Sequence, residues 1–222
     1  MEGLKRLAQR HPWPAEPPDV PEDWHGWLGP ETARALAEHL SPRTRLVVEC
    51  GSWLGVSARA ILDLAPAATL VSIDHWRGSP EHHGNPEWAA RLPRLYATFL
   101  RNLWPHRRRV IPLVADSLDG LAEVAAHGLS PDLVYLDTEH SFARVQAELA
   151  FSTEHWPEAA IVGDDFNNAE VARAAGAHAQ LTGRRLVSYG AAFCLPQRPR
   201  PAGVARWQGS CGSPSRKVGT GS

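Results

Sequence analysis

The sequence has 222 residues, 43% of them apolar, and a formal net charge of −1. This length suits one large domain, and the near-neutral charge argues against general nucleic-acid binding, because phosphate attraction requires a basic field. No apolar run reaches the roughly 18 residues that a membrane-spanning helix needs, and residues 1–20 lack the apolar core of a secretory signal. The three widely spaced cysteines fit neither a disulfide framework nor a zinc ribbon. These features predict a cytoplasmic protein without a nucleic-acid or membrane partner.

The order of elements along the chain predicts an α/β fold. Residues 1–29 are rich in proline and tryptophan and indicate an irregular arm with one short helix. A helix follows in "GPETARALAEHLSP", where Pro30 suits the first turn and Pro42 ends it. From there, apolar runs alternate with helical stretches, as in a parallel sheet with helices on both faces. The predicted strands are Leu46–Cys50, Thr69–Asp74, Val110–Ala115, Leu133–Asp137 and Ala160–Gly163. Between the second and third of them, a loop in "HWRGSPEHHGNPEW" is expected to lead into one long helix, "PEWAARLPRLYATFLRNLW".

The end of the domain differs from the rest. The runs "RRLVSY" and "AFCLP" are separated only by Gly190 and Ala191, and so short a connection permits an antiparallel hairpin but no parallel crossover. We therefore predict a doubly wound, mostly parallel sheet over residues 30–196, closed by a C-terminal antiparallel hairpin. Residues 197–222 are rich in Gly, Ser, Pro and Arg and are predicted to be a disordered tail.

A glycine loop follows the first predicted strand in "LVVECGSWLGVS". Gly51 and Gly55 would let the backbone approach a ligand, and Ser57 opens a helix whose free N–H groups favour an anionic group. The NAD fingerprint G-x-G-x-x-G does not fit, because Trp53 and Val56 stand where its second and third glycines are required. The loop therefore indicates a nucleotide-like ligand other than NAD, with a plain structural turn as the alternative.

Acidic residues follow the strands at the edge where such sheets bind ligands. Asp74 is placed to accept ribose hydroxyls, and Asp116 with Ser117 could contact an adenine edge. Taken alone, Asp116 and Ser117 also fit an ordinary helix cap. Glu49, Asp74 and Asp116 at three successive strand ends are more specific together than any one of them.

Three carboxylates are expected to converge one strand further on. Asp137 ends the fourth strand, and Asp164 and Asp165 end the fifth. Converging carboxylates repel one another unless a hard divalent cation such as Mg²⁺ binds them; the alternative is that one of the pair caps the helix near Asn167. His140, in the next helix's first turn, is placed to take a proton from an acceptor hydroxyl, or it packs under the loop.

Together these residues resemble the class I S-adenosylmethionine-dependent methyltransferases, and most closely the metal-dependent small-molecule O-methyltransferases. That type includes the catechol and caffeoyl-CoA enzymes and the group of macrocin-type and cephalosporin-hydroxylase-like proteins. The resemblance covers roughly residues 45–195 and rests on "VVECGSWLGVS", "VSIDHW", "ADS", "LVYLDTEHSFARVQAEL" and "IVGDD". It implies a Rossmann-like, doubly wound α/β fold with a seven-stranded sheet.

The resemblance also assigns roles to residues. Around the amino-acid part of the cofactor it places Glu49, Gly51, Ser52, Trp53, Gly55 and Ser57. Towards the ribose and adenine it places Asp74, His75 or Trp76, Asp116 and Ser117, and it implicates Asp137 in cofactor binding as well. The metal ligands it implies are Asp137, Asp164 and Asp165. His140 stands where the catechol type has a lysine general base, which is a departure from the pattern.

The expected activity is transfer of a methyl group to a hydroxyl of a small molecule, assisted by Mg²⁺ or a similar cation. The acceptor would carry an aromatic or sugar ring, on which Trp13, Trp24 or Trp27 of the arm would stack; alternatively these tryptophans only pack the arm onto the domain. Two other classes stay open: the same cofactor with N-methylation or hydroxylase-like chemistry, and a non-catalytic binding module. The family likeness also suggests a homodimer.

Overall fold

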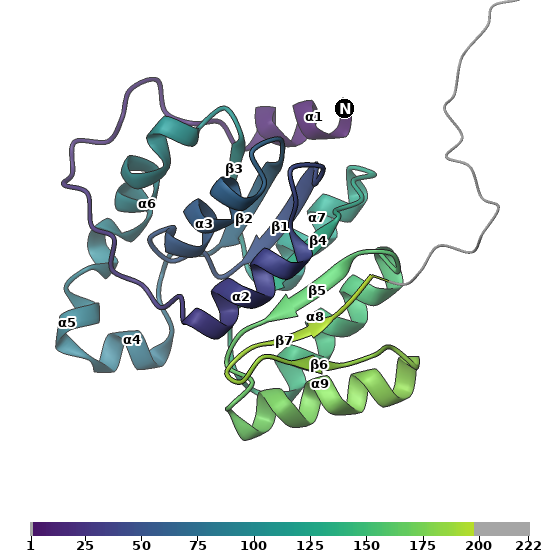
Figure 1. The fold of residues 1–222 in the computed structure, drawn as a ribbon. Helices are drawn as coiled ribbons and strands as arrows, with labels where there is room; N and C mark the ends of the chain where they lie inside the picture. Colours follow the sequence, from purple (N-terminus) through teal and green to yellow (C-terminus); the bar gives the residue numbers. More distant parts are fainter. Residues whose placement is uncertain (1, 198–222) are drawn as a thin grey trace, which may run out of the picture.

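The computed structural model describes residues 2–197, so Met1, Cys211 and the predicted tail from residue 198 onward lie outside the described residues. The described chain folds around one seven-stranded sheet with the strand order β3-β2-β1-β4-β5-β7-β6 (Figure 1). The strands are β1 Leu46–Cys50, β2 Thr69–Asp74, β3 Val110–Val114, β4 Leu133–Leu136, β5 Ala160–Gly163, β6 Val187–Ser188 and β7 Phe193–Leu195. β1 to β5 are parallel, β7 pairs antiparallel with β5, and β6 pairs antiparallel with β7 at the edge. The predicted fold is confirmed.

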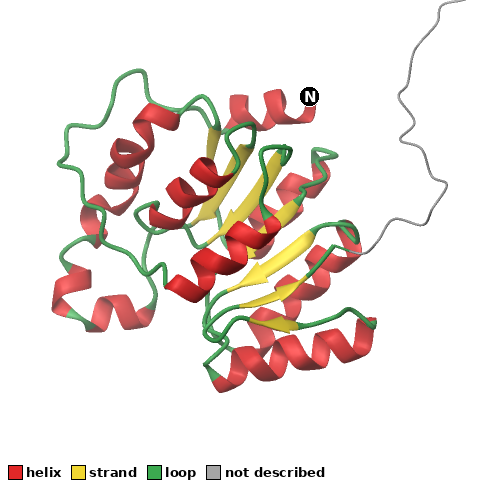
Figure 2. Cartoon of the chain, viewed as in Figure 1, coloured by secondary structure: helices red, strands yellow, loops and turns green. Residues whose placement is uncertain are grey.

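Helices cover both faces of the sheet (Figure 2). Apolar residues of α2, α3 and α6 pack on one face, and those of α1, α7, α8 and α9 pack on the other. Successive residues of a strand point to opposite faces and so enter different cores. In β1, Leu46 and Val48 pack with α1, α7, α8 and α9, whereas Val47 packs with α2, α3 and α6. The helices that cover the two faces are α1 Glu2–Arg10, α2 Pro30–His39, α3 Val56–Leu64, α6 Leu95–Leu103, α7 Ser117–Ala126, α8 Phe142–His155 and α9 Ala169–Thr182.

The segment between β2 and β3 departs from the prediction. The loop expected after β2 contains α4 (Pro80–Gly84), and the long helix expected from residue 86 is divided into α5 (Pro86–Ala89), a 3-10 turn (Leu92–Arg94) and α6. Local chemistry explains the breaks. The side chains of Ser79 and Asn85 cap α4 and α5, and Pro93, which has no N–H, interrupts the helical hydrogen bonds before α6.

The N-terminal arm passes around the β3 edge of the sheet, from one face to the other. Helix α1 lies with α7, where Arg10 and His11 contact the carboxylate of Glu123. Trp13 then donates its indole N–H to the carbonyl of Val110 in β3 at 2.7 Å. The rest of the arm packs against the core of α2, α3 and α6. The arm therefore shields an edge strand that would otherwise be open to pairing.

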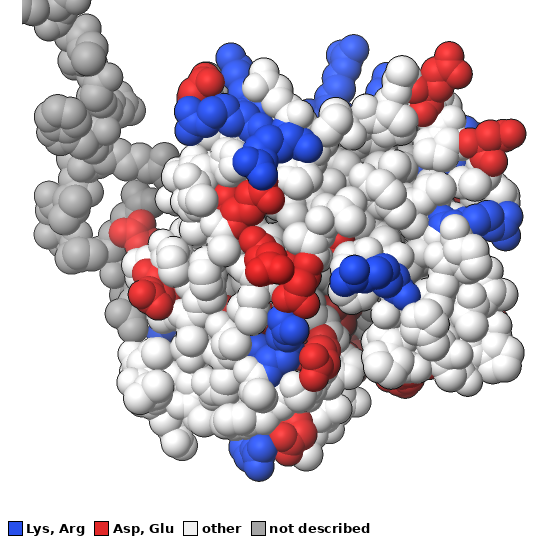
Figure 3. Space-filling view, turned by 180° about the vertical axis from the view of Figure 1, so that it is seen from behind, with Lys and Arg blue, Asp and Glu red and all other residues white. Residues whose placement is uncertain are grey.

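The described surface carries both signs of charge. On the face shown in Figure 3, basic and acidic side chains are interspersed. Within residues 2–197, no helix combines the length and the apolarity that crossing a membrane requires.

Candidate active site at the carboxyl ends of the strands

The glycine loop lies at the topological switch point of the sheet, between the carboxyl ends of β1 and β4, where the strand order reverses. This is where doubly wound sheets bind ligands. Gly51 has a φ of +88°, and a Cβ added there would lie 1.6 Å from the carbonyl oxygen of Asp137. Gly55 has a φ of +89° and is the N-cap residue of α3. Both positions favour glycine, because a residue with a side chain is strained at these positive φ angles. At Gly51 the side chain would also collide with the carbonyl of Asp137.

The buried carboxylate of Glu49 anchors the glycine loop by hydrogen bonds. It is fully buried and accepts hydrogen bonds from the hydroxyls of Ser52 and Ser57, both at 2.6 Å, and Ser72 at 2.9 Å. Burial raises the pKa of Glu49, and the three hydroxyls partly offset that rise. Glu49, Ser52 and Ser57 were expected around the cofactor. Their side chains instead turn inward, where they shape the loop and do not line its surface. Ser72 was not predicted, although it is the one polar residue between apolar neighbours in β2.

Asp74 ties the glycine loop to the loop after β2. Its carboxylate accepts the backbone N–H groups of Trp53 at 2.9 Å and Trp76 at 2.6 Å, and burial raises its pKa. The indole of Trp76 is buried against Phe99 and donates to the carbonyl of Trp53. Of the pair His75 and Trp76, either of which was predicted near the adenine, Trp76 is thus in the core and His75 is the one left open to a ligand.

The end of β3 offers a polar and an apolar surface side by side. Asp116 caps α7 by accepting the N–H of Leu118, as the alternative interpretation expected, and it also binds the guanidinium of Arg144 at 2.6 Å. Although burial works in the opposite direction, Arg144 holds the pKa of Asp116 below its ordinary value. Val114 pairs with Asp74 in the sheet and is 50% exposed. The sequence did not single out Val114, because an apolar strand end normally indicates core.

Asp137, His140 and Asp165 form a group of metal-ligand type. One donor atom from each lies within 4.8 Å of the others, and Nε2 of His140 is 2.8 Å from a carboxylate oxygen of Asp165. Burial, with the neighbouring carboxylates of Asp164 and Asp165, raises the pKa of Asp137 well above its ordinary value. The hydrogen bond to Asp165 raises the pKa of His140. This electrostatic strain between carboxylates is what a cation would relieve.

Asp164 lies outside this group. Its carboxylate accepts the hydroxyl of Thr32 at 2.7 Å and the backbone N–H of Asp165 at 2.9 Å. The buried phenol of Tyr135 is 3.2 Å from a carboxylate oxygen of both Asp164 and Asp137. Two of the three predicted aspartates are therefore brought together, with His140 in the third place. The helix-cap alternative does not apply to the pair, because the cap of α9 is Asn168.

The chain matches the sequence profile of a methyltransferase-domain family over residues 48–166, more than half of its length. It belongs to this family. The matched span begins within β1 and ends just after Asp165, so it contains the glycine loop, Asp74, Asp116 and the group at β4 and β5. Among the curated proteins, none matches the sequence.

Three solved structures share the fold of this methyltransferase. A Staphylococcus aureus protein provisionally assigned as a caffeoyl-CoA O-methyltransferase has a TM-score of 0.55 and 11% identity, over 87% of this chain and 90% of that one. A precorrin 8w decarboxylase from Methanobacterium thermoautotrophicum has a TM-score of 0.52 and 19% identity, over 78% and 83%. The calicheamicin methyltransferase CalS11 has a TM-score of 0.52 and 16% identity, over 74% and 77%. At these identities the likeness establishes the fold.

A small cavity of about 20 Å³ opens beside the metal-type group of the methyltransferase. This volume has room for about one water molecule. Its polar lining is Asp137, Thr138, Glu139, His140, Glu148, Asp164 and Asp165. The carboxylates of Asp137 and Asp165 beside a space of this size are oxygen donors that fit a divalent cation, and His140 lies next to them.

Glu148 is a buried acid that the sequence analysis missed. It lies on α8 with only 1% exposure and accepts hydroxyls from Ser117 and Thr138. Burial raises its pKa to about 7, from an ordinary value of 4.5. An acid among the apolar positions Val145 and Leu149 of the same helix face was the signal that could have found it.

We expect Glu148 to make the methyltransferase less stable as pH rises. The folded protein binds this proton more tightly than the unfolded chain, so the contribution to the free energy of unfolding is largest below pH 4.5 and is lost by about pH 7. Between pH 4.5 and 8, wild type should lose about 3 kcal/mol relative to Glu148→Gln. Urea unfolding of both proteins across this range checks it. If the free energies of unfolding of the two proteins change in parallel with pH, Glu148 ionises as freely in the folded state as in the unfolded chain, and the prediction is wrong.

Proposed function

We propose that this protein transfers the methyl group of S-adenosylmethionine to a hydroxyl of a small molecule, with the help of a divalent cation. Membership of the methyltransferase family supports the methyl transfer. The observation that carries the finer proposal is the group of Asp137, His140 and Asp165, which adjoins the glycine loop through the contact of Gly51 with Asp137. A donor and an activated acceptor oxygen would meet at that point.

The cofactor would lie across the ends of β1, β2 and β3. The methyl donor supplies a sulfonium, which is already activated for displacement, so this chain has to bind and orient it. Gly51 lets the glycine loop pack against the backbone of Asp137, Asp74 fixes the loop that would receive the ribose, and Val114 offers apolar surface beside Asp74. His75, beside Asp74, and Asp116, at the start of α7, would flank the adenine. Buried carboxylates around the loop also favour a cationic ligand.

Asp137 and Asp165 would hold the cation, and His140 would accept the proton of the acceptor hydroxyl. When bound, a divalent cation lowers the pKa of a hydroxyl that coordinates it. The carboxylate of Asp165 orients the imidazole of His140 through their 2.8 Å contact and stabilises its protonated form. Tyr135, between Asp137 and Asp164, fixes the direction of the Asp137 carboxylate. Most of the rate enhancement would come from positioning.

The first test is titration calorimetry with S-adenosylmethionine, with and without Mg²⁺, on wild type and Asp74→Asn. Wild type should bind, and the variant should bind about 10- to 100-fold more weakly, because a charged acceptor of two N–H groups is lost. Asp132→Asn is a matched control: Asp132 also accepts two backbone N–H groups, those of Arg45 and Leu46, but at the start of β4. Absence of binding to wild type in both conditions would overturn the proposal.

A further inference from the structure

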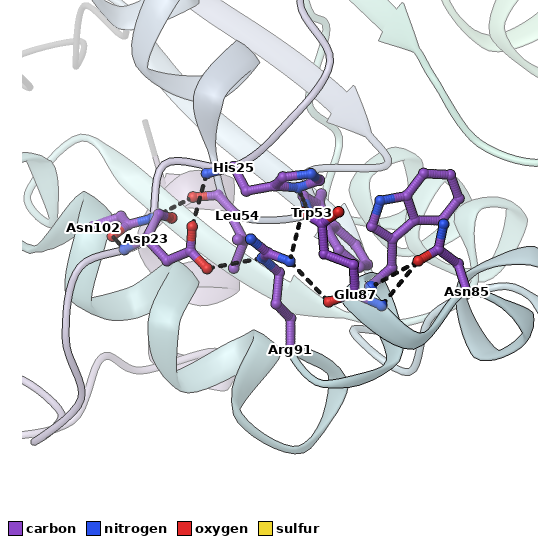
Figure 4. Close-up of polar contacts among 9 residues, drawn as sticks. Asp23, His25, Trp53, Leu54, Asn85, Glu87, Arg91 and Asn102 are labelled. Carbon is purple, nitrogen blue, oxygen red and sulfur yellow. Dashed lines mark hydrogen bonds and ion pairs between the residues drawn. The ribbon is translucent and has the colours of Figure 1, made fainter.

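A buried amide fastens the N-terminal arm to the glycine loop. The side-chain amide of Asn102 donates to the carbonyl oxygens of Asp23 at 2.6 Å and Leu54 at 2.8 Å, and its oxygen accepts the N–H of Asp23 at 3.2 Å. The carboxylate of Asp23 in turn accepts from the N–H of His25 and the guanidinium of Arg91. Figure 4 shows these contacts converging from the arm, the loop and the segment after α5. The position of the arm over the loop is therefore fixed.

The fastened arm places Trp27 in an aromatic cluster, formed by His25, Trp27, Trp53, His82 and Trp88. The ring of Trp27 has its centroid 4.8 Å from that of His25, 5.0 Å from Trp88 and 5.7 Å from Trp53. Behind it, Trp53 and His82 are stacked at 4.4 Å. Trp27 nevertheless stays 48% exposed. An indole that is held by other rings and open on one side loses little conformational entropy when a ligand binds.

The aromatic cluster lies next to the proposed reaction site. Trp53 belongs to the glycine loop and is two residues from Gly51, so their Cα atoms are at most about 8 Å apart. Gly51 itself packs against the carbonyl of Asp137, a member of the metal-type group. The aromatic cluster, through Trp53, and the metal-type group, through Asp137, thus both adjoin the glycine loop.

We propose that Trp27 is the platform of the acceptor subsite and binds a planar aromatic ring that carries the reacting hydroxyl. This rests on the proposed function. Polar side chains around the cluster already bond to the protein: Asp23 to Arg91, Asn85 to the N–H groups that begin α5, and His82 to Ser79. The exposed part of the cluster is the indole of Trp27, so ring contact dominates recognition here.

The test measures binding of 4-nitrocatechol, a planar diol, to the full chain saturated with S-adenosylhomocysteine and Mg²⁺. Trp27→Ala should bind the probe about 3- to 10-fold more weakly than wild type, the loss expected for one aromatic contact, while Trp27→Phe should recover most of it. Trp24→Ala is the matched control, since Trp24 lies on the same arm but packs on Arg59 at 5.0 Å.

Three outcomes would overturn the subsite: no binding of the probe to wild type, equal binding by wild type and Trp27→Ala, or an equal loss in Trp27→Ala and Trp24→Ala. Binding of S-adenosylhomocysteine is measured first on each protein. Its failure in wild type would reject the proposed function itself, whereas normal cofactor binding with no role for Trp27 would reject only the subsite.

Discussion

Gly51→Ala is expected to destabilise the protein by about 3 kcal/mol or more and to abolish cofactor binding. The new Cβ would lie 1.6 Å from the carbonyl oxygen of Asp137 and 2.6 Å from its carbon, both of them backbone atoms. It would also be held at a φ of +88°, where side chains are strained. The glycine loop and the end of β4 would have to separate, and the proposed cofactor site adjoins the metal-type group at this contact.

The control for this substitution is Gly176→Ala. Gly176 lies within α9, and a Cβ added there would meet nothing within 4 Å. Alanine at that position should stabilise the protein by about 0.5–1 kcal/mol, because it restricts the unfolded chain and suits a helix. Urea unfolding and calorimetry with S-adenosylmethionine measure both variants. A Gly51→Ala protein as stable as wild type would mean that the loop and β4 are not packed as described.

Asp137→Asn and Asp165→Asn are each expected to weaken binding of a divalent cation by more than about 100-fold, and to slow methyl transfer with it. Each substitution removes one charged oxygen ligand from the group with His140. Loss of a merely supporting group typically costs about 10- to 100-fold, so loss of a ligand should cost more. Calorimetric titration with Mg²⁺ and Mn²⁺ gives the affinities, and a methyl-transfer assay gives the rates.

Asp164→Asn distinguishes this group from the one expected from sequence. Asp164 is engaged by Thr32, the N–H of Asp165 and Tyr135, and an asparagine oxygen can keep part of that bonding. We expect a loss of about 10-fold in cation affinity, transmitted through Tyr135 to Asp137. If Asp164→Asn loses as much as Asp165→Asn, Asp164 is itself a ligand and must turn away from Thr32 when the cation binds.

Most of the fold was predictable from local sequence. Strands β1, β2 and β5 begin and end at the residues expected from their apolar, β-branched runs, because such runs fit a doubly buried parallel strand. The short Gly190-Ala191 connection predicted the antiparallel hairpin for a steric reason. The sequence predicted one helix from Pro86, whereas the structure divides this segment into α5, a 3-10 turn and α6. The prediction failed because the helical spacing of apolar residues continues across Pro93, the residue that breaks the helix.

The residues of the site were largely predictable, but their orientations were not. That Gly51, Asp74, Asp137 and Asp165 come to one edge follows from the order of residues alone, because parallel strands end there together. The folded structure was needed to see that Glu49 faces inward and that Asp164 turns to Thr32, 132 residues away in sequence. It likewise shows that Asn102 fixes the arm beneath Trp27. Strand and helix periodicity determines which face a residue occupies, whereas the direction of a buried polar side chain depends on distant partners that only folding brings within hydrogen-bonding range.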